Sequence, residues 1–226
     1  MLAQRLGLSI NSTRPLGKWS PDDESSLEAW YQNRVGITLS GSDVSQWADS
    51  SSNSYDVRQI TATEQPAYND TTGALTFVNA DTNNLQSASQ LSLAGEFTIG
   101  IRLYPTSFSN VVIASNTTDN EFIKITANNK IRIKVDGSAA DFDLNDGTFD
   151  DDYIVFTRNA EDLITLWKNG VAQDDTETRA GTVDMDCIGV RKTDLNAYAG
   201  TIKEIQIYSS TSAALTANIN DRLSTL

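Results

Sequence analysis

The chain has 226 residues, of which 39% are hydrophobic and 21% charged, a composition that suits one large globular β domain and argues against disorder. It contains no histidine and one cysteine, Cys187, which excludes Ser-His-Asp and Cys-His catalysis, nearly all zinc sites and any intramolecular disulfide. The net charge of −13 argues against nucleic-acid binding, and no apolar run approaches the length of a membrane span.

The first 19 residues differ from the rest because they carry basic but no acidic side chains. We expect an arm at residues 1–19 and a single domain at residues 20–226. A basic arm on an acidic body leaves two alternatives open, docking to a partner or lying back on its own domain. Docking would use apolar anchors and charge-assisted bonds from six residues: Arg5, Leu6, Leu8, Ile10, Arg14 and Lys18.

The start of the sequence has no apolar run of signal-peptide length. We therefore expect the chain to fold in a reducing cytoplasm, with Cys187 as a small buried hydrophobe. After the arm, Ser20, Pro21 and two acidic residues are typical of a helix start. They predict a short N-terminal helix in which Leu27 and Trp30, spaced i and i+3, face inward.

From residue 75 onward the hydrophobic period becomes two, which indicates β-strands. Residues 97–104 alternate and predict a half-buried strand, and residues 130–135 repeat the pattern. Residues 153–157 are more uniformly apolar and predict a central strand. Asn169-Gly170 is a strong signal for a type I′ hairpin turn, and residues 127–130 give a weaker turn.

The last predicted strand, residues 200–208, has one irregularity. Ile205 and Ile207 alternate well, but Ile202 falls on the opposite parity, so we expect a bulge or burial on both faces. Ser212 then caps an amphipathic C-terminal helix that carries Leu215 and, one and two turns later, further apolar residues at 219 and 223. Many short strands with frequent turns predict an all-β sandwich or jelly roll.

Five segments resemble the concanavalin A-like jelly rolls of the laminin-G-like (LamG-like) type: residues 44–49, 65–68, 97–105, 167–170 and 200–208. The resemblance implies an all-β, concanavalin A-like jelly-roll β-sandwich, here with a short N-terminal helix and a C-terminal amphipathic helix. It also implies that a buried Trp47 anchors the end of a strand. A surface loop would follow at residues 49–55, in which Asp49 and Asn53 bond nearby backbone amides.

A narrower resemblance covers nearly the whole chain. Residues 6–12, 20–23, 26–30 and 213–223 resemble uncharacterised structural proteins of tailed phages that infect marine bacteria, cyanophages especially. This implies a non-enzymatic virion protein made in the host-cell cytoplasm, with a head-decoration role ahead of a tail or fibre role. Its partners would be other capsid or tail proteins and further copies of itself, and the arm would tether it.

The alternative is a lectin-like carbohydrate-binding module on a tail or fibre that contacts host surface glycans. Lectin sites stack an exposed aromatic side chain on a sugar, and Tyr55, Tyr68 and Tyr104 are the candidate platforms. Trp19 and Tyr31 are conceivable platforms as well. Packing in the core or at a sheet edge is the simpler role for each of these side chains.

Acidic side chains raise two further alternatives. The glutamate motif of glucanases with this fold is absent. Asp184/Asp186 and Asp141/Asp143 are pairs of carboxylates on one strand face, but a solvent-exposed strand face explains each pair more simply. We therefore expect no enzymatic activity. Laminin-G-like domains often bind calcium at the rim formed by their loops. By that resemblance, the candidate calcium ligands are Asp150, Asp151, Asp152, Asp174 and Asp175. The simpler alternative is that these are acidic side chains of solvent-exposed turns.

A basic stripe on one predicted hairpin has two interpretations. Lys124, Arg132 and Lys134 would line its outward face. Charged side chains of this kind protect a sheet edge against strand addition, which is the favoured interpretation. The second is contact with an acidic neighbour.

Overall fold

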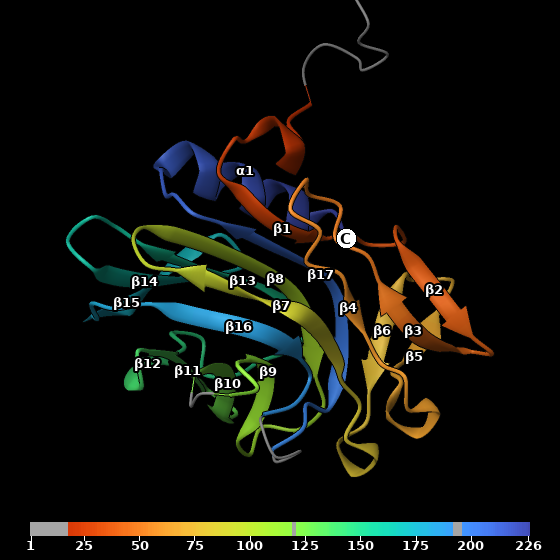
Figure 1. The fold of residues 1–226 in the computed structure, drawn as a ribbon. Helices are drawn as coiled ribbons and strands as arrows, with labels where there is room; N and C mark the ends of the chain where they lie inside the picture. The colour runs from red at the N-terminus through yellow and green to blue at the C-terminus, as the bar shows by residue number, and fades with distance from the viewer. Residues whose placement is uncertain (1–17, 119–120, 192–195) are drawn as a thin grey trace, which may run out of the picture.

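The computed structural model describes residues 18–118, 121–191 and 196–226, and antiparallel strands dominate it (Figure 1). The described residues form seventeen strands. These are β1 (Leu27–Tyr31), β2 (Ile37–Ser40), β3 (Asp43–Trp47), β4 (Val57–Arg58), β5 (Ala67–Asn69), β6 (Ala74–Phe77), β7 (Leu85–Leu93), β8 (Phe97–Pro105), β9 (Val111–Ser115), β10 (Phe122–Ala127), β11 (Lys130–Val135), β12 (Ser138–Asp143), β13 (Asp152–Arg158), β14 (Leu163–Lys168), β15 (Val171–Thr178), β16 (Val183–Ile188) and β17 (Gly200–Tyr208). The helical elements are α1 (Ala213–Ser224) and three 3₁₀ turns, Pro21–Asp23, Ala62–Glu64 and Asn79–Asp81.

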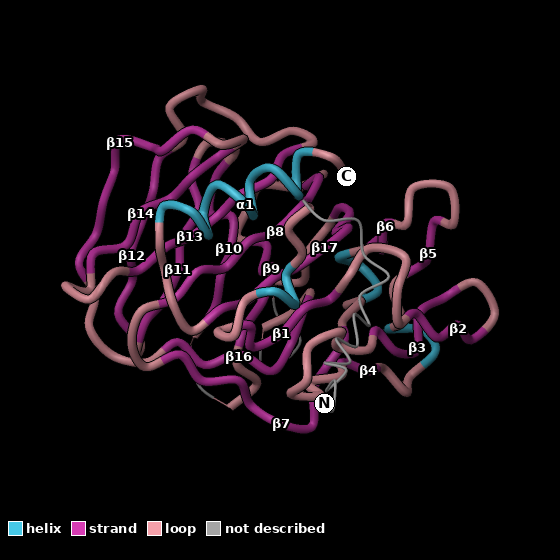
Figure 2. Tube along the Cα trace, turned by 90° about the horizontal axis from the view of Figure 1, so that it is seen from above, coloured by secondary structure: helices cyan, strands magenta, loops and turns pink. Residues whose placement is uncertain are grey.

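The strands form two layers joined at one end (Figures 1 and 2). The first layer runs β1–β17–β8–β13–β14–β15, and the second runs β7–β16–β9–β10–β11–β12. Strands β2 to β6 link the two layers, because β6 pairs with β17 while β4 pairs with β7. This arrangement confirms the predicted all-β sandwich.

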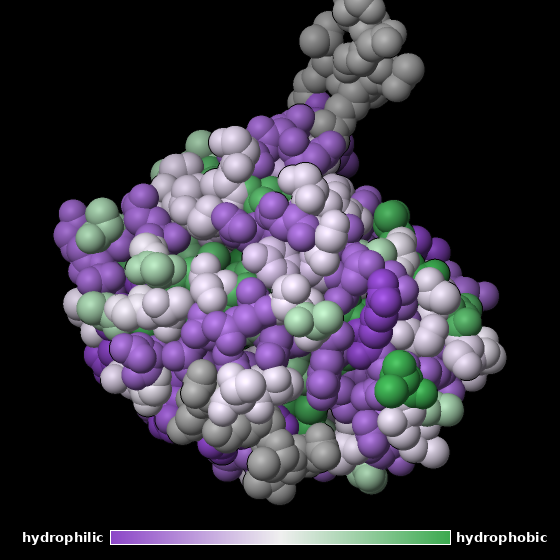
Figure 3. All heavy atoms as spheres, in the orientation of Figure 1, coloured by the Kyte–Doolittle hydropathy of each residue, from purple (hydrophilic) through white to green (hydrophobic). Residues whose placement is uncertain are grey.

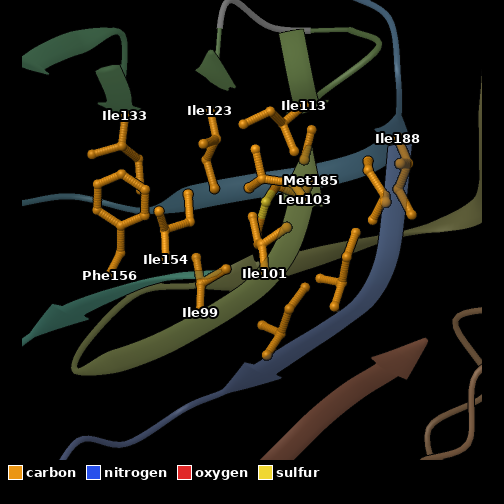
Figure 4. Close-up of a cluster of buried hydrophobic side chains, with 14 of the residues drawn as sticks. Ile99, Ile101, Leu103, Ile113, Ile123, Ile133, Ile154, Phe156, Met185 and Ile188 are labelled. Carbon is orange, nitrogen blue, oxygen red and sulfur yellow. The ribbon is translucent and has the colours of Figure 1, made fainter. Parts of the chain in front are cut away.

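The core lies between the two layers. Ile99, Ile101 and Ile154 of the first layer face Ile123 and Ile133 of the second (Figure 4). All five side chains are fully buried. The alternating pattern that predicted β11 is confirmed, because its odd-numbered residues enter this core while its even-numbered residues point away from it.

Helix α1 covers the outer face of the first layer (Figure 2). Ser212 caps it by accepting a hydrogen bond from the Leu215 backbone N–H at 3.0 Å, as predicted. Ile219 and Leu223 pack on β8 and β13, where Val155 is buried beneath them. No helix in the described ranges is long and apolar enough to cross a membrane.

This cover corrects one prediction. Residues 97–104 do not form a half-buried strand, because Thr98 and Gly100 on the outer face of β8 are also buried, Gly100 beneath α1 and Thr98 beside Ser210. An alternating pattern reports only that one face is apolar, whereas Gly and Thr tolerate burial under a helix. The central position predicted for residues 153–157 is confirmed, since β13 lies between β8 and β14.

Strand β17 is an interior strand of the first layer. It pairs with β8 on one side and with both β1 and β6 on the other. Its register with β8 shifts between Ile202 and Glu204, which is the irregularity that the parity of Ile202 predicted. The outward-facing Glu204 is fully buried and accepts hydrogen bonds from Trp30 Nε1 (3.0 Å) and Arg222 Nη2 (2.9 Å).

The predicted N-terminal helix is only one 3₁₀ turn. The Ser20 N–H donates to Asp23 Oδ2 at 2.9 Å, so the predicted helix start is real, but Glu24 is extended and ends the turn. Leu27 and Trp30 lie on β1, which pairs with β17, and not on a helix. Pairing with a strand some 180 residues away in sequence overrides the local helix signal.

Both predicted turns and the Trp47 segment are present. Asn169 and Gly170 have φ values of 50° and 79° between β14 and β15, as a type I′ turn requires. Trp47 is fully buried at the end of β3, and Asp49 accepts hydrogen bonds from the N–H groups of Trp30, Ser51 and Tyr55. The prediction for Asn53 was wrong, because its side-chain amide donates to the carbonyls of Leu27 and Glu28.

Candidate functional site

An exposed tyrosine stands on the outer face of β8 where the cover by α1 ends. Gly100 lies directly beneath Ile219 and Leu223. Tyr104 lies four residues further along the same face and is 42% exposed. Tyrosine is enriched at binding interfaces because it combines an apolar ring with a polar hydroxyl group.

The register of three strands places two hydroxyl groups in line with this ring. Thr201 of β17 pairs with Tyr104 of β8 and, on its other side, with Thr76 of β6. Residues paired directly across antiparallel strands point to the same face. The side chains of Thr76, Thr201 and Tyr104 therefore form one row across the sheet.

This row forms the floor of an open hollow of about 300 Å³. The hollow is lined by Asn69, Thr72, Ala74, Thr76, Tyr104, Asp151, Thr201 and Lys203. We call it the Tyr104 hollow. Its lining combines one aromatic ring with hydroxyl, amide, carboxylate and ammonium groups.

Several of its polar groups are held in place by the rest of the chain. Asp151 forms an ion pair of 2.9 Å with Arg102, and Lys203 Nζ donates to the Leu226 carbonyl at 2.7 Å. Asn69 Oδ1 accepts from the N–H groups of Thr71 (3.0 Å) and Thr72 (3.1 Å). A site whose groups are fixed before binding loses little conformational entropy when a ligand arrives.

The structure does not bring the three candidate tyrosines together. Tyr68 is half-buried against the core, next to Asn69 of the Tyr104 hollow. Tyr55 is also half-buried against the core and borders a separate apolar cavity of about 20 Å³, which is large enough for one water molecule. Trp19 donates to Glu24 at 2.8 Å, and Tyr31 is buried.

The predicted docking residues cannot be assembled into a surface. Arg5, Leu6, Leu8, Ile10 and Arg14 lie outside the described residues. Lys18 is described and exposed, and it borders a hollow with Trp19, Trp30 and Arg222. The predicted boundary between arm and domain at residue 19 stays a prediction, as does docking through the arm.

The acids considered for catalysis lie in the second layer, where most have partners. Asp141 accepts two hydrogen bonds from Arg132, and this lowers the pKa of Asp141. Asp143 forms an ion pair with Lys130. Asp186 accepts from the N–H and hydroxyl of Thr117. A carboxylate tied to a guanidinium is a poor proton donor, because its acidic form is disfavoured.

The aspartates considered as calcium ligands contact different groups of the protein. Lys168 is buried, and its ammonium group contacts Asp146 Oδ2 (2.5 Å), Asp152 Oδ2 (3.2 Å) and the Thr148 carbonyl (2.7 Å). An ammonium ion thus occupies the position among these oxygens that a bound cation would take. Asp175 accepts from the Asp143 N–H, and the Asp174 N–H donates to Asn145.

Within the described part of the chain, no three Asp, Glu, His or Cys side chains are grouped to hold a metal ion. Calcium binding stays a prediction. Asp150 and Asp152 interact with each other, since the Asp150 N–H donates to Asp152 Oδ2 at 2.7 Å.

Sequence reasoning identified Tyr104 but missed most of the hollow around it. Thr76 and Thr201 are not separable from other strand threonines until the β6–β17–β8 register is known. Asn69 and Thr72 belong to a turn whose side-chain roles depend on the fold. Asp151 appeared only among the calcium candidates.

The basic stripe is not at a sheet edge. Strand β10 pairs with β9 and β11, and β11 pairs with β10 and β12. The interpretation of Lys124, Arg132 and Lys134 as edge protection was therefore wrong. Hairpin prediction identifies which residues share a face, but not whether further strands flank the hairpin.

Comparison with known proteins supports the fold class. No family model matches the chain, and no curated protein matches it either. Among solved structures, it resembles the botulinum neurotoxin type G receptor binding domain, with a TM-score of 0.56, 14% identity, and coverage of 89% of this chain and 51% of that one. The binding domain of Paraclostridial Mosquitocidal Protein 1 gives a TM-score of 0.54, 14% identity, and coverage of 91% and 53%.

A third similar structure is domain 4 of AbnA, an extracellular arabinanase from Geobacillus stearothermophilus, in complex with arabinotriose. Its TM-score is 0.54 at 14% identity, and the match covers 87% of this chain and 97% of that domain. The chain spans about half the length of the two toxin binding domains. At these identities the similarity shows the fold alone, which is the predicted jelly-roll β-sandwich.

Proposed function

We propose that this chain is a non-catalytic carbohydrate-binding module and that the Tyr104 hollow is its binding site. The observation that carries the proposal is an exposed aromatic ring, 42% accessible, set among fixed polar groups on the sheet face beside α1. Sugars offer an apolar C–H face and a rim of hydroxyl groups. A ring beside polar side chains complements both features.

The contacts would divide by chemistry. The Tyr104 ring stacks on the apolar face of a sugar. The hydroxyl groups of Thr76 and Thr201, which lie in line with that ring, bond the sugar hydroxyls, and the Asp151 carboxylate accepts from another. The hollow is open to solvent, so it suits part of an extended chain better than an enclosed small molecule.

The structural neighbours are consistent with this proposal because they are binding domains in larger proteins. The arabinanase domain was solved with a bound arabino-oligosaccharide, and the match covers nearly all of it. The toxin domains are named for receptor or other binding. At 14% identity these neighbours place no site on this chain, so the proposal depends on the Tyr104 hollow.

A glycan array followed by calorimetry tests the proposal. We expect saturable binding by the wild type, and about tenfold or greater weakening in Tyr104→Ala, because loss of the ring removes the stacking surface. Tyr104→Phe keeps the ring and should retain most of the affinity. Val171→Ala, which changes an exposed apolar residue in the β14–β15 hairpin, is the matched control. Glycan binding that Tyr104→Ala leaves unchanged, or no binding by the wild type, would contradict the proposal.

The virion role is a separate proposal that comes from the phage resemblance. In that setting the module would be displayed on the particle and would contact glycans of the host surface. Cosedimentation with particles that lack the protein tests it, with the full chain compared with residues 20–226. Binding by the full chain alone supports a tether in the arm, whereas equal binding by both removes the arm from that role.

A further inference from the structure

A buried aromatic ring surrounded by cations lies on the outer face of the second layer. Phe122 of β10 is only 3% exposed. Its chain neighbour Ile123 and the Ile133 side chain opposite point into the core, so the Phe122 ring points the other way. The Lys124 and Lys134 ammonium groups lie 4.8 Å and 5.3 Å from the ring centroid.

Two guanidinium groups complete this cluster, which we call the Phe122 cluster. Arg191, just after β16, lies with its Cζ 5.4 Å from the same centroid. Arg132 of β11 is directly opposite Lys124 in the β10–β11 register. Residues from three parts of the chain thus place three cationic side chains around one ring, with Arg132 beside one of them, in a protein whose net charge is −13.

The positive charge of the cluster is poorly compensated. Asp141 is bound to Arg132 through both of its oxygens, at 2.8 Å and 2.7 Å. Among the described residues, neither Lys124 nor Lys134 forms an ion pair, and Lys124 Nζ donates to the neutral Asn110 side chain at 3.1 Å. Lys124, Arg132 and Lys134 therefore leave a net charge of two after Asp141 is counted.

The pKa values of Lys124 and Lys134 are lowered by burial and by the neighbouring positive charges. Burial is the main cause that lowers the pKa of Lys124, followed by the positive charges of Arg132 and Arg191. Burial also lowers the pKa of Lys134, again with contributions from Arg191 and Arg132. Cation–π contacts stabilise each cation but do nothing to reduce the repulsion between the cations.

Edge protection does not explain the cluster, because both of its strands are paired on each side. A bound anion does explain it, since an anion would neutralise the uncompensated charge and accept hydrogen bonds from ammonium and guanidinium donors. We propose that the Phe122 cluster binds a dianionic tetrahedral oxyanion, a phosphate or sulfate group. The cluster lies in the second layer and Tyr104 in the first, so this proposal stands apart from the Tyr104 hollow.

The first experiment is calorimetric titration of the full chain with inorganic phosphate at constant ionic strength, with chloride as the comparison. We expect saturable phosphate binding that chloride does not reproduce. Lys134→Met should weaken it about tenfold, because one charge-assisted contact is lost. Lys130→Met, on the same face of β11 but paired with Asp143, should bind as the wild type does.

A second titration, with glucose 6-phosphate and with glucose, distinguishes a phosphate group carried on a sugar from the free phosphate ion. Tighter binding of glucose 6-phosphate than of inorganic phosphate supports a phosphate carried on a sugar, and equal binding supports the free ion. Tyr104→Ala should leave both values unchanged, which separates the two proposed sites. Equal effects of Lys134→Met and Lys130→Met, or equal responses to phosphate and chloride, would overturn the proposal. If Lys134→Met alters the fold, Lys134→Gln provides the second variant.

Discussion

At the residue scale, the buried carboxylate of Glu204 needs a counter-charge and hydrogen-bond donors from its neighbours. Its carboxylate is fully buried and is bound by Arg222, Trp30 Nε1 and the side-chain amide of Gln206. Arg222 is the single cation in this arrangement, and it belongs to α1, while Glu204 belongs to β17. The ion pair therefore fixes the helix to the sheet.

We expect Arg222→Leu to lower the free energy of unfolding by about 3–5 kcal/mol, because it leaves a buried carboxylate without its counter-charge. Urea denaturation measures the change. Lys130→Met, which breaks the exposed pair with Asp143, should change the same quantity by less than about 1 kcal/mol. Similar losses of unfolding free energy in the two variants would show that the burial of Glu204 does not increase the contribution of its ion pair.

Glu121 predicts a dependence of stability on pH. Burial is the main cause that raises the pKa of Glu121 above its ordinary value of 4.5; hydrogen bonds from the Asp184 and Asp136 backbones oppose this shift, and the negative charges of the two side chains add to it. The folded state then holds this proton more tightly than the unfolded chain does. The contribution of Glu121 to stability therefore falls as the pH rises from 4.5 through the raised value.

Glu121→Gln removes this titration and keeps an acceptor for the Asp184 N–H. The variant should gain stability relative to the wild type as the pH rises from about 4 to 7. Chemical denaturation at several pH values measures the difference. The exposed Glu161→Gln serves as the control, and a wild-type minus variant difference that is flat across this range would rule out the assigned shift.

At the element scale, the contact between α1 and β8 depends on a glycine. A Cβ atom at Gly100 would lie 2.5 Å from Ile219 Cγ2 and 3.2 Å from Leu223 Cδ1. Only a residue without a side chain lets the helix approach the strand this closely. The fit explains why a glycine interrupts an otherwise favourable strand sequence.

Gly100→Ala should therefore destabilise the protein by about 1–3 kcal/mol through overpacking. Combining it with Ile219→Ala should cost less than the sum of the two single changes, since the smaller side chain makes room for the new methyl group. Gly95→Ala is the control, because nothing lies within 4 Å of its Cβ position. Additive losses in the double variant would contradict this account of the packing.

The elements themselves were largely predictable from local sequence. Strand β11, the Asn169-Gly170 hairpin and α1 follow from period, turn chemistry and capping, which depend on neighbouring residues. The errors have a common cause. The helix expected through Trp30 and the half-buried face of β8 depend on elements distant in sequence, and the edge position of β10 and β11 depends on whether β9 and β12 pair with them.

At the scale of the whole molecule, excess negative charge opposes the compact state. The net charge is −13, and the face seen in Figure 3 is mainly hydrophilic, with small scattered hydrophobic patches. Self-repulsion of this kind is screened by salt. Raising NaCl from about 10 to 150 mM should therefore raise the melting temperature. KCl should act equally, and a fall in melting temperature with either salt would show that attractive pairs dominate.

The residues of the candidate site are brought together only by strand pairing in the folded protein. Tyr104 was a candidate platform in the sequence, but so were Tyr55 and Tyr68. The pairing of β6, β17 and β8 places Thr76 and Thr201 beside Tyr104. Thr76 lies 28 positions before Tyr104 and Thr201 lies 97 positions after it, so no local pattern could have grouped them.

The interior position of β17 also bears on how the chain is made. β17 follows all the other described strands in sequence, yet it separates β8 from both β1 and β6. Until residue 208 has emerged, the nascent first layer consists of strands whose facing edges have no partner. Unpaired edges of this kind recruit strands from other chains. Translation that stops before β17 would thus leave an aggregation-prone product, and the addition of β17 closes both edges in a single step.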